Sequence, residues 1–199
     1  MDIKNYKTVI VLFPPMLGGN HLANMISTSP NVSNRTLTDD DNYKKILNDY
    51  YSSVAQDAHV GNIKNVGVFD TNTVYETIKK VDKPFIIAGH IDEACYVFQT
   101  IQNLSPFLFI YFEWQTLNNA INKRINFIDP LLTKWAYSGN VISKIFETTG
   151  DNMYWIDPND LFNEDITTFL RSINDNLNLD LDLDFCLELH KKWLRKIST

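Results

Sequence analysis

Four short apolar runs, separated by longer stretches with helical spacing, constrain the fold of this chain more than any other feature. The runs are KTVIVLF, FIIA, FLFIYF and MYWI, at residues 7–13, 85–88, 107–112 and 153–156. The first is rich in β-branched residues and ends at two prolines, and the third is apolar throughout, as in a strand covered on both faces. Strands that alternate with helices predict βα units and a parallel sheet, and therefore an α/β fold.

The stretches between these runs predict helices and loops. Helices are expected over 20–27, 43–56, 92–103, 115–127 and 130–148, with two more after residue 156. Asn20 is the expected N-cap of the first helix, and Ile46, Tyr50 and Val54 form the apolar stripe of the second. Residues 31–42 are expected to form a polar loop, and 66–69 could form a further short strand. Without repeats or linkers, residues 1–199 are expected to form one domain.

Composition excludes several classes of function. The net charge of −6 and the pI of about 5.1 disfavour a nucleic-acid-binding surface. The two cysteines, Cys95 and Cys186, form neither a metal-binding spacing nor a disulfide framework, which indicates a reducing compartment. The N-terminus is too polar for a signal peptide and no stretch could span a bilayer, so we expect a cytoplasmic protein without a metal site or a membrane span.

The stretch FPPMLGGNHLANMI, at residues 13–26, joins the first predicted strand to the first predicted helix. Glycines at such a turn let the backbone approach a ligand, and the helix start adds unpaired N–H groups and a positive dipole end. These groups can bind an anion without a lysine. The stretch matches neither a Walker A loop nor G-x-G-x-x-G. The alternative is a tight turn whose only special feature is a cap at Asn20.

His90 follows the second apolar run and Gly89, at the edge of the sheet where the glycine turn is also expected. A neutral imidazole at this edge suits a general base near pH 7. The alternative is a buried histidine that hydrogen-bonds to the backbone.

Several segments, taken in order, resemble the sulfotransferases. PMLGGNHL aligns without a gap with their phosphosulfate-binding loop, P-K-S-G-T-T-W-L, and KPFIIAGHID is similar to the segment that carries their catalytic histidine. FLFIYFEWQTLNNAINKRI, MYWIDPNDLF, ITTFLRSINDNLNLDL and HKKWL resemble later elements of the family. The resemblance implies a three-layer α/β/α fold with a central, mostly parallel sheet and a P-loop-like turn.

The resemblance also implies an activity. The donor would be 3′-phosphoadenosine 5′-phosphosulfate (PAPS), with His90 as the general base. The acceptor would be a hydroxyl or amine on a small molecule, glycan or lipid, and a homo-oligomer is compatible with this function. The implied cofactor-binding residues lie mostly in the glycine turn: Gly18, Gly19, Asn20, His21, Leu22 and Arg124. His21 could instead pack as the family tryptophan does, and Arg124 could instead be a solvated surface charge.

The departures from the family pattern keep other functions open. The loop lysine is Met16, and the arginine for the 3′-phosphate falls at Phe112 or Glu113. A glutamate beside a phosphate would repel it in a desolvated site. The hydroxyl positions of the loop are glycine and asparagine, and the serine position falls near residues 120–121. The first alternative is an inactive binding or assembly protein with the same fold; the weaker one is a kinase or nucleotidase of P-loop type.

Overall fold

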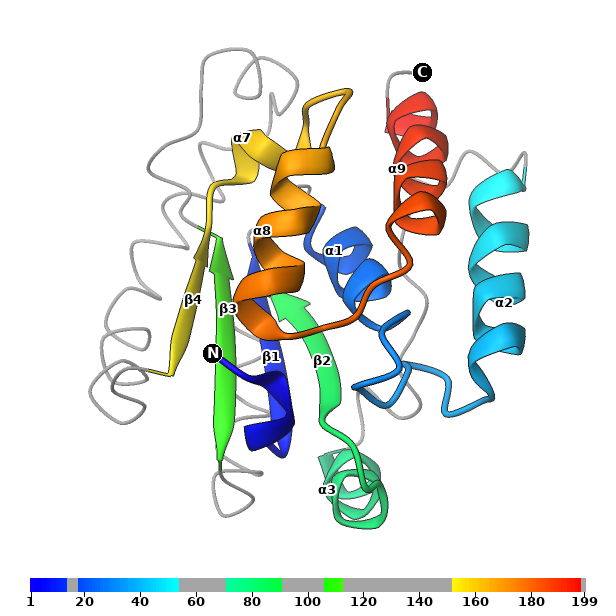
Figure 1. Cartoon of the computed structure of the whole chain (residues 1–199). Helices are drawn as coiled ribbons and strands as arrows, with labels where there is room; N and C mark the ends of the chain where they lie inside the picture. Colours follow the sequence, from blue (N-terminus) through cyan, green and yellow to red (C-terminus); the bar gives the residue numbers. More distant parts are fainter. Residues whose placement is uncertain (14–17, 54–70, 91–105, 113–151, 198–199) are drawn as a thin grey trace.

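A single parallel sheet organises the part of the chain that the computed structural model describes, which is residues 1–13, 18–53, 71–90, 106–112 and 152–197, with the backbone alone at 71–73 and 90. Its strands are β1 (Thr8–Phe13), β2 (Phe85–His90), β3 (Phe107–Phe112) and β4 (Met153–Ile156). The order is β2-β1-β3-β4 and every pair is parallel (Figure 1). The four predicted strands and the α/β class are confirmed.

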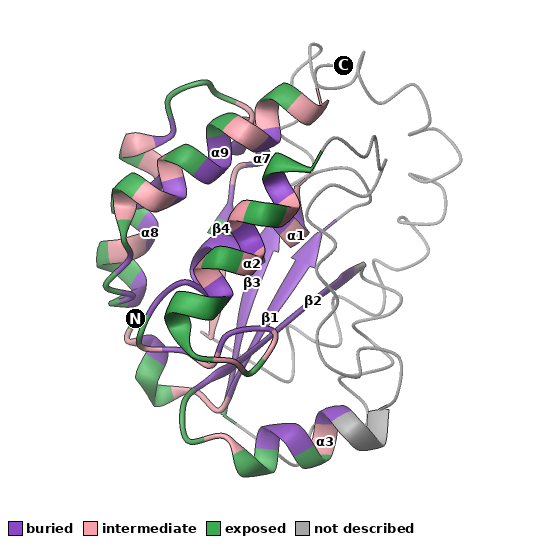
Figure 2. Cartoon of the chain, turned by 90° about the vertical axis from the view of Figure 1, so that its right-hand side faces the viewer, coloured by how far each residue is buried: buried purple, intermediate pink, exposed green. Residues whose placement is uncertain are grey.

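The described helices gather mainly on one side of this sheet. They are η1 (Ile3–Asn5), α1 (Gly19–Ile26), α2 (Asp40–Ser52), α3 (Thr71–Lys80), α7 (Pro158–Leu161), α8 (Thr167–Leu177) and α9 (Leu183–Ile197). Helices α1, α2, α8 and α9 lie on the same side in two perpendicular views (Figures 1 and 2). Helix α1 packs on β1 and β2, and α9 packs against α1, α2 and α8.

Both faces of the central strands are buried. Every residue of β1 and β3 is buried (Figure 2). Val9 and Val11 face the helical layer and join its core, while Ile10 and Leu12 on the opposite face are equally inaccessible. A strand in this position has no solvated face, which is why its sequence shows no polar alternation.

Helix α2 begins three residues earlier than the sequence indicated. Asp39 is its N-cap, and the Asp39 carboxylate accepts a hydrogen bond from the N–H of Asn42 at 2.8 Å. The loop expected over 31–42 therefore ends at this aspartate. The acidic run at the helix start, Asp40 and Asp41, is favoured by the helix dipole.

The buried face of α2 also differs from the predicted one. Tyr43, Leu47 and Tyr51 are buried, whereas Ile46 and Tyr50 are only partly buried. The predicted stripe through Ile46 and Tyr50 was therefore wrong. The hydroxyl of Tyr51 has hydrogen-bond partners inside the protein, which lets a residue with a polar group occupy the core face.

The structure contains helices that the sequence did not predict, and some predicted elements lie outside the described residues. Helix α3 was not predicted, and three helices follow β4 where two were expected. The possible strand at 66–69 lies outside the described residues. The predicted helices over 92–103, 115–127 and 130–148 do so as well.

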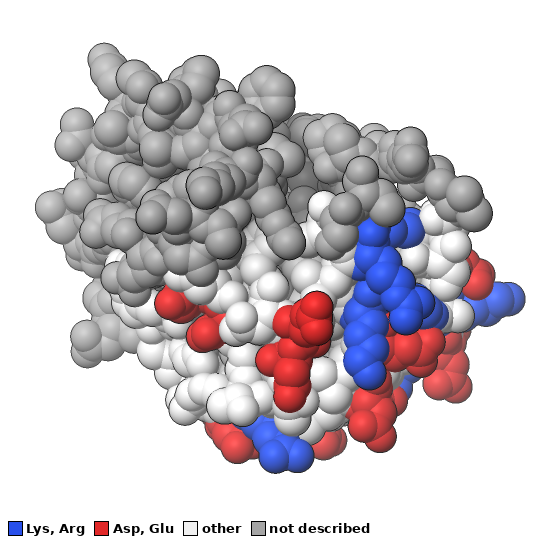
Figure 3. Space-filling model, turned by 90° about the horizontal axis from the view of Figure 1, so that it is seen from above, with Lys and Arg blue, Asp and Glu red and all other residues white. Residues whose placement is uncertain are grey.

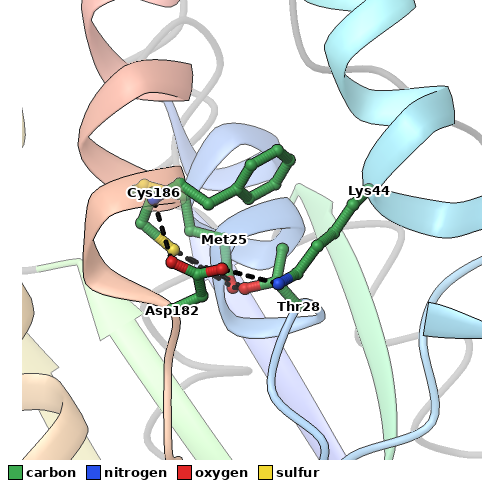
Figure 4. Close-up of polar contacts among 6 residues, drawn as sticks. Met25, Thr28, Lys44, Asp182 and Cys186 are labelled. Carbon is green, nitrogen blue, oxygen red and sulfur yellow. Dashed lines mark hydrogen bonds and ion pairs between the residues drawn. The ribbon is translucent and has the colours of Figure 1, made fainter. Parts of the chain in front are cut away.

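Helix α9 begins at a polar cluster that joins it to α1 and α2 (Figure 4). The Asp182 carboxylate accepts hydrogen bonds from the N–H of Phe185, at 3.1 Å, and from Nζ of Lys44, at 2.7 Å. Behind this cap, Sγ of Cys186 lies 3.6 Å from Oγ1 of Thr28. Burial raises the pKa of the Cys186 thiol to about 11, so it remains protonated at neutral pH. Cys186 is a small core residue, as expected, and Cys95 lies outside the described residues.

Candidate functional site

The carboxyl ends of β1 and β2 meet at the glycine turn. The register pairs Phe13 with His90, the last residue of each strand. The chain places β2 on one side of β1 and β3 on the other, so the strand order reverses at β1. In open parallel sheets the ligand crevice lies outside the carboxyl ends at such a point. The backbone of His90 therefore lies at the predicted edge; its proposed role as a base stays a prediction.

Gly18 and Gly19 are required by the packing of this turn. Gly18 has a φ of +76°, and a Cβ there would lie 2.8 Å from atoms of Leu161 and Trp193. A Cβ at Gly19 would lie 1.9 Å from Cγ of Phe13. Gly18 is the N-cap of α1; its backbone is left-handed, and the cap has no side-chain hydrogen bond. The prediction of Asn20 as N-cap was therefore wrong, because the helix has already begun at Gly19.

The first turn of α1 leaves backbone donors available. The first helical hydrogen bond runs from the N–H of Leu22 to the carbonyl of Gly18, at 2.9 Å. The N–H groups of Gly19, Asn20 and His21 have no hydrogen-bond partner among the described residues. Together with the helix dipole, these three donors form a cradle suited to an anion. Leu22 is fully buried, so it contributes packing to this turn.

Arg35 is the cation that sequence reasoning missed. Its Nη1 donates to Oδ1 of Asn24 at 2.8 Å, and its Nη2 donates to Oδ1 of Asn20 at 3.1 Å. Its side chain is 1% exposed, and burial lowers its pKa. An arginine guanidinium nevertheless stays protonated in proteins. Arg35 therefore places a positive charge beside the first turn of α1. Its sequence context, a polar segment with no periodic pattern, carries no signal of this burial.

A line of buried hydrogen bonds continues from Arg35 through the helical layer. Nδ2 of Asn24 donates to the hydroxyl of Tyr51 at 3.0 Å, and that hydroxyl lies 2.9 Å from Nδ1 of His21. Nε2 of His21 lies 3.3 Å from Nδ1 of His190. Nε2 of His190 lies 2.8 Å from the carbonyl oxygen of Asn163. The line connects five segments of the chain: the one that holds Arg35, the helices α1, α2 and α9, and the one that holds Asn163.

The ring of His21 packs instead of facing the cradle. It is fully buried and stacks on Trp193, with ring centroids 4.5 Å apart and an interplanar angle of 10°. Both ring nitrogens have the partners just described. The structure thus shows the packing alternative for the His21 side chain, and only its backbone N–H remains a candidate ligand. Burial lowers the pKa of His21 well below 6.5, and it also lowers the pKa of His190.

The carboxyl end of β3 is less suited to binding a phosphate than the start of α1. Phe112 is fully buried, and its ring lies 6.1 Å from the ring of Phe13. One of the two positions aligned with the family arginine is thus part of the core. The other aligned position, Glu113, and the candidate Arg124 lie outside the described residues, as does Met16.

Seen from above, many of the basic side chains of the described residues form one stripe beside acidic ones, and a few others lie apart from it (Figure 3). Two of the three lysines of α9 have side-chain partners: Lys192 is hydrogen-bonded to Asn48 and paired with Glu188 at 2.8 Å, and Lys196 donates to the carbonyl of Tyr50 at 3.0 Å. The contacts with Asn48 and Tyr50 attach α9 to α2.

Comparisons with protein-family models, with curated proteins and with solved structures find no match to this chain. Within the described ranges, no group of three or more His, Cys, Asp or Glu side chains is placed to hold a metal ion. Every helix in those ranges is too short or too polar to span a bilayer. The strongest site that the described residues form is therefore the anion cradle at the start of α1.

Proposed function

We propose that this chain is a sulfotransferase-like protein that binds PAPS at the α1 cradle and transfers its sulfuryl group to a hydroxyl or amine. The observation that carries the proposal is the meeting of the glycine turn with the carboxyl ends of β1 and β2. The N–H groups of Gly19, Asn20 and His21 would hold the phosphosulfate, and His90 would take the proton of the acceptor. Arg35 would supply positive charge that the loop lacks at Met16.

Binding of the spent cofactor, adenosine 3′,5′-bisphosphate, is the direct test of the cradle. We expect calorimetric titration to give a micromolar Kd for the wild type. Asn20→Asp should weaken binding by about tenfold or more, because it adds a negative charge beside the phosphate. The aspartate keeps an acceptor for Arg35, so the turn should stay folded.

Asn42→Asp is the matched control, because it makes the same change in the first turn of α2 at an exposed residue. It should leave the affinity unchanged. Absence of binding by the wild type at millimolar ligand would rule out this donor site, and equal affinities in both variants would place the ligand elsewhere.

The role of His90 is tested by transfer of labelled sulfate to a panel of alcohols, phenols, amines and glycans. We expect His90→Asn to lower the transfer rate by roughly 100- to 10,000-fold, the usual contribution of a general base. The Kd for the bisphosphate should change little, because the cradle is built from backbone groups of α1. An unchanged rate in the variant would exclude His90 as the base.

The burial of Phe112 favours a second candidate function. In this alternative the protein has the same fold and binds the bisphosphate but does not catalyse sulfuryl transfer. This phenylalanine is part of the core at a position aligned with the arginine that holds the 3′-phosphate. Bisphosphate binding without transfer to any acceptor in the panel would support this candidate over the enzyme.

A further inference from the structure

The buried line from Arg35 to Asn163 has a fixed hydrogen-bond direction, because each end can act in one way only. Arg35 has donors and no acceptor, so Asn24 must turn its oxygen toward Arg35 and its amide N–H toward Tyr51. At the other end the carbonyl of Asn163 can only accept, so Nε2 of His190 must carry a hydrogen. The donor and acceptor roles of the groups between these two ends are therefore fixed as well.

The fixed ends determine the proton on each histidine. A neutral His190 that donates from Nε2 accepts at Nδ1, so His21 must donate from its own Nε2. Nδ1 of His21 then accepts from the hydroxyl of Tyr51. With both rings neutral, each is therefore protonated at Nε2, and every member of the line has a partner.

One additional proton cannot be accommodated without breaking a hydrogen bond. Protonation of His190 at Nδ1 would make it face another donor, Nε2–H of His21. If His21 moved its proton to Nδ1, that N–H would face the hydroxyl of Tyr51. The Tyr51 hydrogen would then lose its acceptor, and Arg35 prevents Asn24 from turning to provide one. Both imidazole rings are fully buried, so the unmet donor and the added charge would both lack water.

The histidine pair also joins the two helices that enclose the glycine turn. His21 is in α1, and His190 is in α9, one turn before Trp193. Trp193 stacks on His21 and lies against Gly18, within 3 Å of where a Cβ would be. Separation of the two histidines would therefore remove the cover that α9 places over Gly18.

We propose that His21 and His190 form a proton-operated latch that holds α9 closed over the glycine turn at neutral pH and releases it in mild acid. The latch does not depend on the proposed sulfotransferase activity, since it concerns the closure of α9 alone. It would make access to this edge of the sheet sensitive to pH.

The direction of the effect follows from the groups that face the pair. These are Tyr51 from α2, Arg35 and Tyr43 beyond it, and the Asn163 carbonyl; no described carboxylate lies against either ring to favour the charged form. The pKa of each histidine is thus lower in the closed form than its ordinary 6.5. Closure is fully favoured above pH 6.5 and is weakened as the pH falls below it, because only the open form takes up protons.

Hydrogen exchange by mass spectrometry, normalised to the intrinsic rates, tests the latch. In the open form His21 and His190 would each have an ordinary pKa near 6.5 and would each take up a proton. We therefore expect the opening constant of α9 to rise by about 100-fold from pH 7.5 to pH 5.5, about tenfold for each histidine. His190→Gln keeps one acceptor and one donor but cannot titrate, so it should reduce this rise to about tenfold. Lys191→Gln, at the exposed neighbouring residue, should keep the full rise.

Two outcomes would overturn the latch. One is an opening constant of α9 that changes by less than threefold over this pH range. The other is protection in α9 equal to that in β1 and β3, since α9 would then open only when the whole fold unfolds.

The tautomers provide a test on the wild-type protein that needs no variant. Long-range proton–nitrogen NMR of histidine-labelled protein should show His21 and His190 neutral and protonated at Nε2 at pH 7.5. A charged ring, or a hydrogen on Nδ1 of either residue, would refute the fixed direction of the line and with it the latch.

Discussion

Gly19→Ala is expected to destabilise the fold by about 3 kcal/mol or more, at the upper end of overpacking effects. The new Cβ would lie 1.9 Å from Cγ of Phe13 and 2.0 Å from Cδ1. The Phe13 ring cannot move away easily, because it is 3% exposed and packs beside Phe112. Helix propensity alone predicts the opposite sign, since alanine is better than glycine in a helix by about 1 kcal/mol. Urea denaturation measures the difference.

A double-mutant cycle isolates the cause. In a Phe13→Ala background the clashing ring is gone, so Gly19→Ala should cost less than about 1 kcal/mol. Phe13→Leu keeps a Cγ at the same place and should not rescue the variant. Equal costs in all three backgrounds would show that backbone conformation, and not the Phe13 ring, requires glycine. Because Gly19 substitutions disturb the core, loss of ligand binding in such a variant would not identify the cradle; Asn20→Asp does.

Arg35→Met is expected to lower the free energy of unfolding by about 3 kcal/mol, although methionine fills much of the same volume. The substitution removes the hydrogen bonds that Arg35 donates to the buried Oδ1 of Asn24 and to the half-buried Oδ1 of Asn20, and a hydrogen bond from a charged group contributes roughly 1.5–3 kcal/mol. Arg35→Lys should cost less, because it keeps the charge but lacks the planar fork that reaches both oxygens.

The measurement is again urea denaturation, with Arg195→Met as the control. Arg195 is exposed in the last turn of α9, so its loss should change stability by less than about 0.5 kcal/mol. A stable Arg35→Met protein would contradict the structural role of this residue. The same variant should also reduce the pH response of α9, because Arg35 would no longer hold the oxygen of Asn24 toward itself.

The sequence by itself determined the strands and their class. Each strand was recognisable because a buried strand needs a short run of apolar residues, and those runs end at prolines, glycines or polar residues that close the segment. The parallel arrangement followed from the helical stretches between the runs. The importance of the glycine turn was also visible, since Gly18 and Gly19 lie between the first predicted strand and the first predicted helix.

Only the tertiary structure decided which side chains meet there. Helical spacing could not show that α2 buries Tyr43 and Tyr51 in place of Ile46 and Tyr50, because burial depends on how α2 docks and the partners of the Tyr51 hydroxyl come from α1. Arg35 had no local pattern that marked it as buried. His21 and His190 are 169 residues apart in the chain, yet their rings share a hydrogen bond. Such contacts depend on how helices dock on a sheet, a long-range packing choice that local periodicity does not contain.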